Sequence, residues 1–187
     1  MSLVSVFDRV GVPYMIVGSY SSNFYGIPRS TKDADLVVHL PSAEWAKLPS
    51  LLPDGIEMED QMSFEMVTST RRELLRVKQS LFQIELFRLS DDPHDQARFE
   101  RRRKLEIFPG VEVFLPTAED VIVQKLRWNL GAKRQKDFTD VVAVLQVQSQ
   151  VLDWPYIEKW CAEHGTLEVL AQAKAEAALA WEDEEDA

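Results

Sequence analysis

The sequence predicts an α+β protein, with a mixed β-sheet flanked by helices and a helical C-terminal third. Short β-branched and aromatic runs of strand length recur up to residue 115, whereas the chain after Thr117 follows a helical pattern. Strands followed by a block of helices are typical of the α+β class. We therefore expect an α/β core at residues 1–116, a helical region packed on it at 117–181, and an acidic tail at 182–187.

The first half of the chain is expected to contain five strands and two helices. Each strand is a short apolar run that ends near a turn-forming residue. The expected strands are residues 12–17, 35–40, 64–70, 74–79 and 82–89. Ser19 can cap a short helix that ends near Tyr25, before Gly26-Ile27-Pro28. A second helix is expected from Ser42 to Leu52, before Pro53.

The second half begins with a charged surface helix at residues 91–104. Pro109-Gly110 then predicts a tight turn between two strands, at 104–108 and 111–115. Four helices follow, because capping residues and glycines divide the remaining chain. They are expected at residues 117–130, at 136–148, from Asp153 to Gly165, and after Gly165.

Composition and charge exclude several classes of protein. The chain has 187 residues, 45% of them apolar, which is enough for a folded core. The net charge of −10 argues against non-specific coating of nucleic acid. Residues 71–136 nevertheless carry 15 Lys and Arg against 10 Asp and Glu, which leaves room for a local anion site.

Compartment and metal class can also be read from the sequence. Cys161 is the single cysteine, so an internal disulfide is excluded, and no Cys/His spacing is typical of zinc. No apolar run approaches the roughly 20 residues of a membrane span, and the N-terminus lacks the pattern of a signal peptide. We expect a cytoplasmic protein without membrane contact.

The most informative segment is Gly18–Val38. Asp33 and Asp35 are two residues apart at the start of an expected strand, so both side chains lie on one face. Two close carboxylates repel each other unless a cation lies between them, and hard oxygen ligands suit Mg²⁺. The Gly18-Ser19 turn adds backbone N–H groups and a hydroxyl for an anion. Together they indicate phosphoryl or nucleotidyl transfer, although an Asp-x-Asp pair by itself is often a solvated strand edge.

This segment resembles the signature of the DNA polymerase beta-like nucleotidyltransferase superfamily. Tyr25-Gly-x-Pro-Arg-x-Thr-x-Asp-x-Asp-Leu resembles one bacterial branch, the minimal nucleotidyltransferases related to AbiEii-type toxins. The resemblance implies that Gly18 and Ser19 grip triphosphate oxygens and that Asp33 and Asp35 hold two Mg²⁺ ions. It places Arg29 and Thr31 near phosphate or the second substrate.

A third carboxylate is usual in that superfamily, as a metal ligand or base. Glu85 is the best match, because it lies within an expected strand between apolar neighbours, where a lone acid is costly. The family residue is usually Asp. The alternative is that Glu85 points to solvent together with Gln83.

A second resemblance covers Lys125–Val141. It is similar to the Lys-Leu…Arg-x-Lys-Asp-x-x-Asp stretch that closes the active site in the same branch. By this likeness Lys125 meets nucleotide phosphate, and Asp137 or Asp140 orients the attacking group or a lysine. The alternative is an acid-rich first helical turn that is favourable to the helix dipole.

The resemblance implies an Mg²⁺-dependent nucleotidyltransferase that binds an NTP in a cleft between sheet and helices. A nucleoside monophosphate would pass to a hydroxyl and pyrophosphate would leave. The acceptor stays open among a tRNA end, a protein side chain and a small molecule, and an antitoxin partner is also open. The rival hypothesis is a nucleotide- or partner-binding module on the same fold without turnover.

Overall fold

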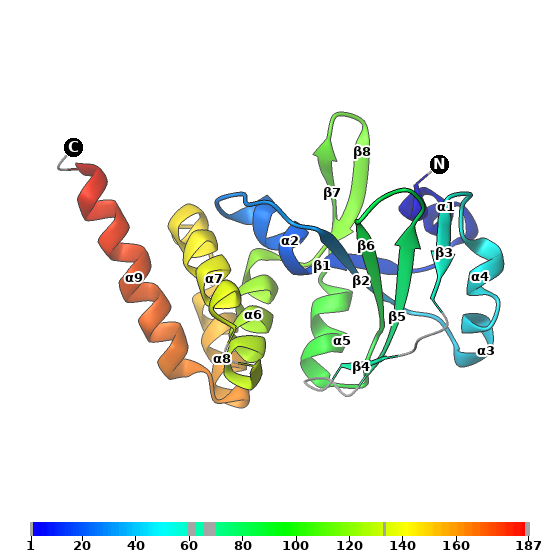
Figure 1. Cartoon of the computed structure of the whole chain (residues 1–187). Helices are drawn as coiled ribbons and strands as arrows, with labels where there is room; N and C mark the ends of the chain where they lie inside the picture. Colours follow the sequence, from blue (N-terminus) through cyan, green and yellow to red (C-terminus); the bar gives the residue numbers. More distant parts are fainter. Residues whose placement is uncertain (1, 60–62, 66–69, 133, 186–187) are drawn as a thin grey trace. The chain divides into compact units, whose positions relative to one another are not determined.

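The computed structural model of the chain describes residues 2–59, 63–65, 70–132 and 134–185. Contacts divide the chain into two compact units, whose elements are labelled in Figure 1. The first unit comprises residues 1–18 and 30–116, and the second comprises residues 19–29 and 117–187. Residues 19–29, which the sequence places in the N-terminal core, therefore group by their contacts with the C-terminal helices.

The first unit is built on a mixed sheet, as the sequence predicts. The described strands are Tyr14–Val17 (β1), Asp33–Val38 (β2), Ile56–Met58 (β3), Ser63–Glu65 (β4), Thr70–Val77 (β5) and Gln83–Arg88 (β6). Their order is β1-β2-β6-β5-β3, and β4 also pairs with β5. The β2–β6 pair is parallel and the other pairs are antiparallel. β2 and β6 thus lie side by side inside the sheet (Figure 1).

The expected strands differ from the observed ones mainly at their ends. The predicted strand at 74–79 begins earlier, at Thr70, because β5 continues its pairing with β4 and β6. It ends at Val77, shortly before Gln79, which has a left-handed φ of 59°. Of the strand predicted at 64–70, residues 66–69 lie outside the described residues. The short strand β3 was not predicted.

Helices and a hairpin complete the first unit. They are α1 (Leu3–Val10), α3 (Ser42–Trp45), α4 (Leu48–Leu51), α5 (Pro93–Glu100), β7 (Arg103–Phe108) and β8 (Val111–Leu115). The predicted hairpin is confirmed. Its ladder begins at Arg103, so the helix predicted at 91–104 is shorter than expected. The helix predicted at 42–52 is wrong as one element, because Pro49 has no N–H to continue it. The helix α1 was not predicted.

One face of the sheet changes from apolar to acidic along β2 and β6. Its apolar part is a buried cluster of Met15, Val17, Val37, Phe87 and Phe99. Because side chains alternate along a strand, Asp35 and Glu85 lie on the same face as Val37 and Phe87, two residues earlier. The core of this unit therefore ends where the predicted site begins.

The second unit is helical, as expected for the last third of the chain. Its helices are α2 (Gly18–Tyr25), α6 (Ala118–Ala132), α7 (Gln135–Gln148), α8 (Trp154–His164) and α9 (Leu167–Glu185). The first residue of α2, Gly18, is counted with the first unit. α7 packs against α6 and α9, and α8 packs against α6. In the described ranges, no helix combines the length and apolar character that a membrane span requires. Residues 182–185 of the expected tail belong to α9, and residues 186–187 lie outside the description.

The segment 19–29 is held closely against α7. Gln148 donates a hydrogen bond from Nε2 to the carbonyl of Tyr25, at 3.0 Å. A Cβ added at Gly26 would lie 2.8 Å from backbone atoms of Ala143 and Val144. Glycine is therefore required at position 26 by the close approach of two backbones.

We expect Gly26→Ala to destabilise the protein. Backbone atoms cannot move aside as a flexible side chain can, and overpacking of this kind typically costs about 1–3 kcal/mol. Chemical denaturation followed by circular dichroism measures the change. Gly55→Ala is the control, because nothing lies within 4 Å of a Cβ there, so its cost comes from its φ of +90° alone. An unfolding free energy for Gly26→Ala within about 0.5 kcal/mol of wild type, the usual range of a neutral substitution, would contradict this packing.

Candidate functional site

Asp33 and Asp35 stand at the start of β2, in the first unit. They occupy the first and third positions of the strand and are half-buried, so both lie on one face of the sheet. Asp35 pairs in register with Val17 of β1 and with Glu85 of β6. The predicted acid pair therefore lies on a central strand, where neighbouring strands fix its backbone.

Thr31 orients the first of these acids. Its Oγ1 donates a hydrogen bond to Oδ1 of Asp33 at 2.6 Å. Its Oγ1 also lies 3.2 Å from the carbonyl oxygen of Asp33. Thr31, which the resemblance places near phosphate, thus contacts a carboxylate and limits its rotation.

Gly18 leaves the space that the second acid uses. A Cβ at this position would lie only 1.9 Å from Oδ2 of Asp35. Gly18 also has a φ of +66°, in the left-handed region that side chains disfavour. Two independent constraints, the backbone angle and the close approach of Asp35, therefore require glycine here.

Glu85 lies beside Asp35 but is paired with an arginine. Its Oε2 accepts a hydrogen bond from Nη1 of Arg72 at 2.9 Å, and its side chain is 19% exposed. In the part of the chain that the structure describes, no three His, Cys, Asp or Glu side chains form a group able to hold a metal. Glu85 is therefore in register with the acid pair, while its carboxylate is bound to Arg72.

A second group of predicted residues converges on Asp140 in the second unit. Arg29 donates from Nε to Oδ1 at 2.6 Å and from Nη2 to Oδ2 at 2.9 Å. Lys125 Nζ donates to Oδ2 at 2.6 Å, and Ser22 Oγ donates to the same oxygen at 3.1 Å. We call Ser19, Ser22, Arg29, Lys125, Asp137 and Asp140 the Asp140 network. Its centre is one carboxylate that receives two cations.

Lys125 is held inside this network. Its Nζ also donates to Oδ1 of Asp137 at 2.9 Å, and its side chain is only 5% exposed. The second oxygen of Asp137, Oδ2, is buried and has no hydrogen-bond partner among the described residues. Lys125 therefore bridges two buried carboxylates of α7.

Arg29 connects the network to the turn that the sequence singles out. Its Nη2 donates to Oγ of Ser19 at 3.0 Å, and its side chain is 35% exposed. The amide of Asn23 fixes the Arg29 backbone, with Nδ2 donating to the carbonyl at 2.7 Å and Oδ1 accepting from the N–H at 3.1 Å. A guanidinium and a hydroxyl are thus held together next to Gly18 in the sequence, and both groups can bind an anion.

The network lowers the pKa of Asp140. Burial by itself would raise the pKa of this carboxyl group. The hydrogen bond from Arg29 and the positive charge of Lys125 outweigh burial, so the pKa lies below its usual value. The charged form of Asp140 therefore stabilises the fold at neutral pH, and this stabilisation is lost as the pH falls through the folded-state pKa.

We expect Asp140→Asn to be most destabilising near neutral pH. Removing one partner of a buried ion pair typically costs about 3–5 kcal/mol. The difference in unfolding midpoint from wild type should shrink below about pH 4, where Asp140 becomes protonated in the unfolded chain and then in the folded chain. Thermal unfolding from pH 7 to pH 2 measures it. Glu112→Gln, at an exposed pair with Lys104, is the control. An equal difference at all pH values would contradict the assignment.

Some residues of both groups were not predicted from the sequence. Arg72 belongs to no motif, and Ser22 and Asn23 lie between the motif positions of the Gly18–Val38 segment. Their partners are distant in the sequence or lie across a turn. The sequence motif leaves Asp140 as an alternative to Asp137, from which it is three residues away, so one helix face carries both. The shared helix face was the available signal for it.

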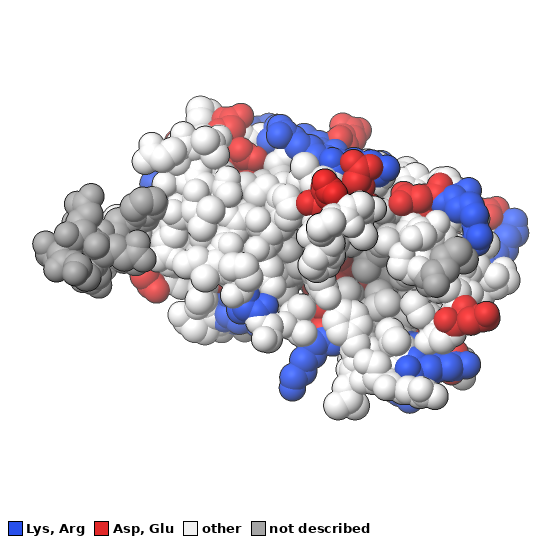
Figure 2. Space-filling view, turned by 90° about the horizontal axis from the view of Figure 1, so that it is seen from above, with Lys and Arg blue, Asp and Glu red and all other residues white. Residues whose placement is uncertain are grey.

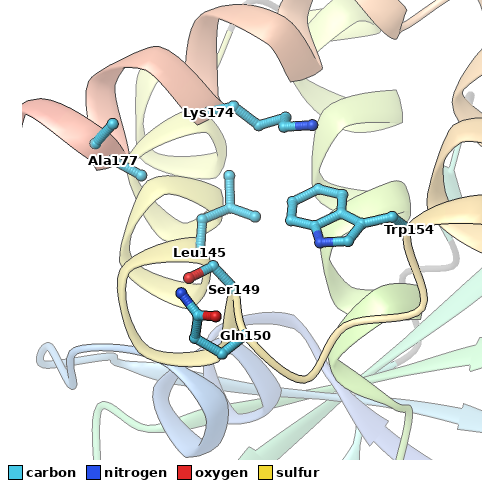
Figure 3. Close-up of a pocket in the computed structure, with 7 residues that line it drawn as sticks. Leu145, Ser149, Gln150, Trp154, Lys174 and Ala177 are labelled. Atoms are coloured by element: carbon cyan, nitrogen blue, oxygen red, sulfur yellow. The ribbon is translucent and has the colours of Figure 1, made fainter.

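One pocket of the helical unit is lined by none of the predicted site residues. A hollow of about 390 Å³ opens on the helical unit, and Lys174 Nζ lies 4.1 Å from the ring centroid of Trp154 at its wall (Figure 3). Its lining residues are Leu145, Ser149, Gln150, Trp154, Lys174, Ala177 and Ala178. None of them is a predicted site residue, so the candidate site is not assigned to this hollow.

Charges are mixed on the face of the molecule that Figure 2 shows. On the face shown in Figure 2, Lys and Arg side chains lie interspersed with Asp and Glu side chains. This face is not covered by a continuous patch of Lys and Arg, which nucleic-acid-binding proteins usually present.

Comparisons with solved structures agree with the fold. The solution structure of the antibiotic-resistance factor ANT(2'')-Ia superposes with a TM-score of 0.60 at 12% identity, over 90% of each chain. The crystal structure of ANT(2'')-Ia in complex with adenylyl-2''-tobramycin gives 0.58 at 12% identity, over 86% of this chain and 91% of that chain. JHP933 from Helicobacter pylori gives 0.47 at 13% identity, over 98% and 92% of the two chains. The two higher scores show a shared fold.

The family comparison identifies the chain more directly. No curated protein matches it significantly. A family model described as "Nucleotidyl transferase AbiEii toxin, Type IV TA system" matches residues 20–186, which is nearly the whole chain. The resemblance seen in the sequence motifs is thereby confirmed. The chain belongs to the AbiEii nucleotidyl transferase toxin family, and it is a nucleotidyltransferase.

Proposed function

We propose that this nucleotidyltransferase requires Mg²⁺ and moves a nucleoside monophosphate from an NTP to an acceptor hydroxyl, releasing pyrophosphate. The observation that carries the proposal is the acid pair on β2, with Asp33 held by Thr31 and Asp35 lying in the space left by Gly18. Oriented carboxylates on a rigid strand are the ligands that a hard cation prefers.

The residues at the start of β2 fit divalent metal ions. Asp33 and Asp35 offer hard oxygen donors from one strand face, and we propose Glu85 as the third ligand because it is in register with Asp35. When bound, two Mg²⁺ ions would neutralise the triphosphate and stabilise the attacking and leaving oxygens. The chain's own contribution is to hold the carboxylates in place, as Thr31 and the β2–β6 pairing support.

We propose that Ser19 and Arg29 bind the triphosphate. The backbone N–H groups at the start of α2, the Ser19 hydroxyl and the Arg29 guanidinium are all donors, which an anion requires. Arg29 keeps 35% of its side chain exposed although Asp140 binds it, so it can reach a ligand. Asp140 acts as a positioning residue for Arg29.

Lys125 and Asp137 are buried, and we propose that they act inside the Asp140 network. The contacts of Lys125 with Asp137 and Asp140 support a role in fixing the two carboxylates. Asp137 would orient Lys125 rather than the attacking group, because its Oδ1 accepts the lysine hydrogen bond. Direct contact of Lys125 with phosphate, as the sequence motif suggests, stays a prediction that the variants below test.

The acceptor is a tRNA end, a protein side chain or a small-molecule hydroxyl. The crystal structure of ANT(2'')-Ia contains adenylyl-2''-tobramycin, which supports a small-molecule acceptor as one of these three proposals. The mixed charges in Figure 2 offer no support for an extended RNA-binding surface on that face. An antitoxin protein and a cytoplasmic location are proposed from the family description and the sequence.

The function is tested by label transfer. The purified chain is incubated with each α-labelled NTP and with separate RNA, protein and small-molecule fractions, with and without Mg²⁺. We expect one fraction to acquire label and pyrophosphate to appear in equal amount, only when Mg²⁺ is present. Labelling that persists in excess chelator would contradict the metal requirement.

We expect Asp33→Asn and Asp35→Asn each to lower transfer by at least about a hundredfold, the scale of a lost positioned ligand. Each removes one of two neighbouring like charges, so the unfolding midpoint should stay level or rise. Transfer rates and thermal unfolding measure both effects. Asp54→Asn, at an exposed turn carboxylate, is the matched control and should keep wild-type activity. Near-normal turnover in either variant would remove that acid from the site.

Arg29→Gln and Lys125→Met separate phosphate contact from internal support. We expect Arg29→Gln to weaken NTP binding by about tenfold or more, because charge-assisted hydrogen bonds to the triphosphate are lost. Lys125→Met should chiefly lower the unfolding midpoint, since it leaves Asp137 and Asp140 buried without their lysine.

Isothermal titration with a non-hydrolysable NTP and thermal unfolding distinguish the two residues. Lys104→Gln, at an exposed basic residue of β7, serves as the control for general charge. A Lys125→Met variant with wild-type stability and weak NTP binding would instead establish direct contact of Lys125 with phosphate.

A further inference from the structure

The ion pair between Arg72 and Glu85 lies next to the proposed metal ligands. On β5, Leu74 is directly opposite Glu85. Arg72 and Arg76 are each two residues from Leu74, so all three share the face that carries Glu85. Arg72 therefore reaches Glu85 diagonally across two strands, with Nη1 2.9 Å from Oε2.

The carboxylates of Asp35 and Glu85 are stabilised by a positive charge next to them. They are partners on neighbouring parallel strands, which lie about 4.8 Å apart, and both side chains are on one face. Neighbouring carboxylates on one face repel each other unless a cation balances them. In this structure Arg72 supplies that balance for Glu85.

The same pair explains why Glu85 does not join the acid pair. The described residues include no group of three carboxylates placed to hold a metal, although the register puts Glu85 beside Asp35. Glu85 is only partly exposed, at 19%, and an oxygen of its carboxylate is bound to the guanidinium. Recruiting Glu85 to a metal then requires its carboxylate to leave or share Arg72.

We propose that Arg72 is a positioning residue that competes with the divalent cation for Glu85. Arg72 holds the third carboxylate when no metal is bound and releases it to the metal, so the free chain binds divalent ions weakly. This rests on the proposed function, because it takes Asp33, Asp35 and Glu85 as the ligands. Arg72 is 37% exposed, so its guanidinium can turn toward solvent when Glu85 leaves it.

The experiment measures Mn²⁺ binding to the full chain without nucleotide, by calorimetry and by electron paramagnetic resonance. Mn²⁺ suits the same carboxylate ligands as Mg²⁺. We expect Arg72→Gln to bind Mn²⁺ about three- to tenfold more tightly than wild type, the scale of one partly screened charge. Arg76→Gln is the matched control: it is on the same strand face, but its partner is Glu59, so its affinity should stay within about twofold.

A double-mutant cycle assigns the effect to Glu85. In a Glu85→Gln background, Arg72→Gln should change Mn²⁺ affinity by less than about twofold, because the competed ligand is absent. Arg72→Lys keeps the charge and is expected to bind Mn²⁺ less tightly than Arg72→Gln. Unfolding midpoints of all variants report whether each remains folded.

Several results would overturn the role of Arg72. These are unchanged or weaker Mn²⁺ binding in Arg72→Gln, or an equal gain in the Glu85→Gln background, which would indicate a general charge effect. If Asp35→Asn abolishes Mn²⁺ binding but Arg72→Gln brings no gain, only this inference fails and the proposed metal site stands. If neither wild type nor Arg72→Gln binds Mn²⁺, both the inference and the metal part of the proposed function fail.

Discussion

Repulsion between carboxylates on one sheet face is the constraint that governs the acidic end of β2 and β6. The parallel pairing of β2 with β6 brings Glu85 beside Asp35, on a face whose far end is apolar core. Like charges at this spacing need fixed geometry and opposite charge nearby. Thr31 supplies the first for Asp33, and Arg72 supplies the second for Glu85. The proposed cation site therefore starts from carboxylates that Thr31 and Arg72 already hold.

The second unit balances charge in the opposite way, by burying a lysine between carboxylates. Lys125 forms ion pairs with both Asp137 and Asp140, and Arg29 forms a second ion pair with Asp140. Buried ions are tolerated when each has a partner, so these residues depend on one another more than on solvent. Of the two cations on Asp140, Arg29 is the more exposed, and it also donates a hydrogen bond to Ser19.

Local signals predicted the elements well, and long-range pairing decided their ends. The hairpin around Pro109-Gly110 and the helix that begins after Asp153 follow from turn and cap residues, and both are confirmed. The helical pattern at 42–52 is interrupted because Pro49 has no N–H to continue the first helix and instead lies in the first turn of α4. β5 begins before its apolar run because its neighbours supply backbone partners there.

The sequence by itself determined the family, the α+β class and the acid pair, because Gly18-Ser19 and Asp33-x-Asp35 depend only on local spacing. Only the tertiary structure decided which charges meet. Arg72 and Glu85 are 13 residues apart, and Arg29 and Asp140 are 111 residues apart. Strand register and helix packing bring such residues together, and both are set by burial of apolar side chains over the whole unit. Local periodicity can place a carboxylate on a face, but its partner is chosen by the fold.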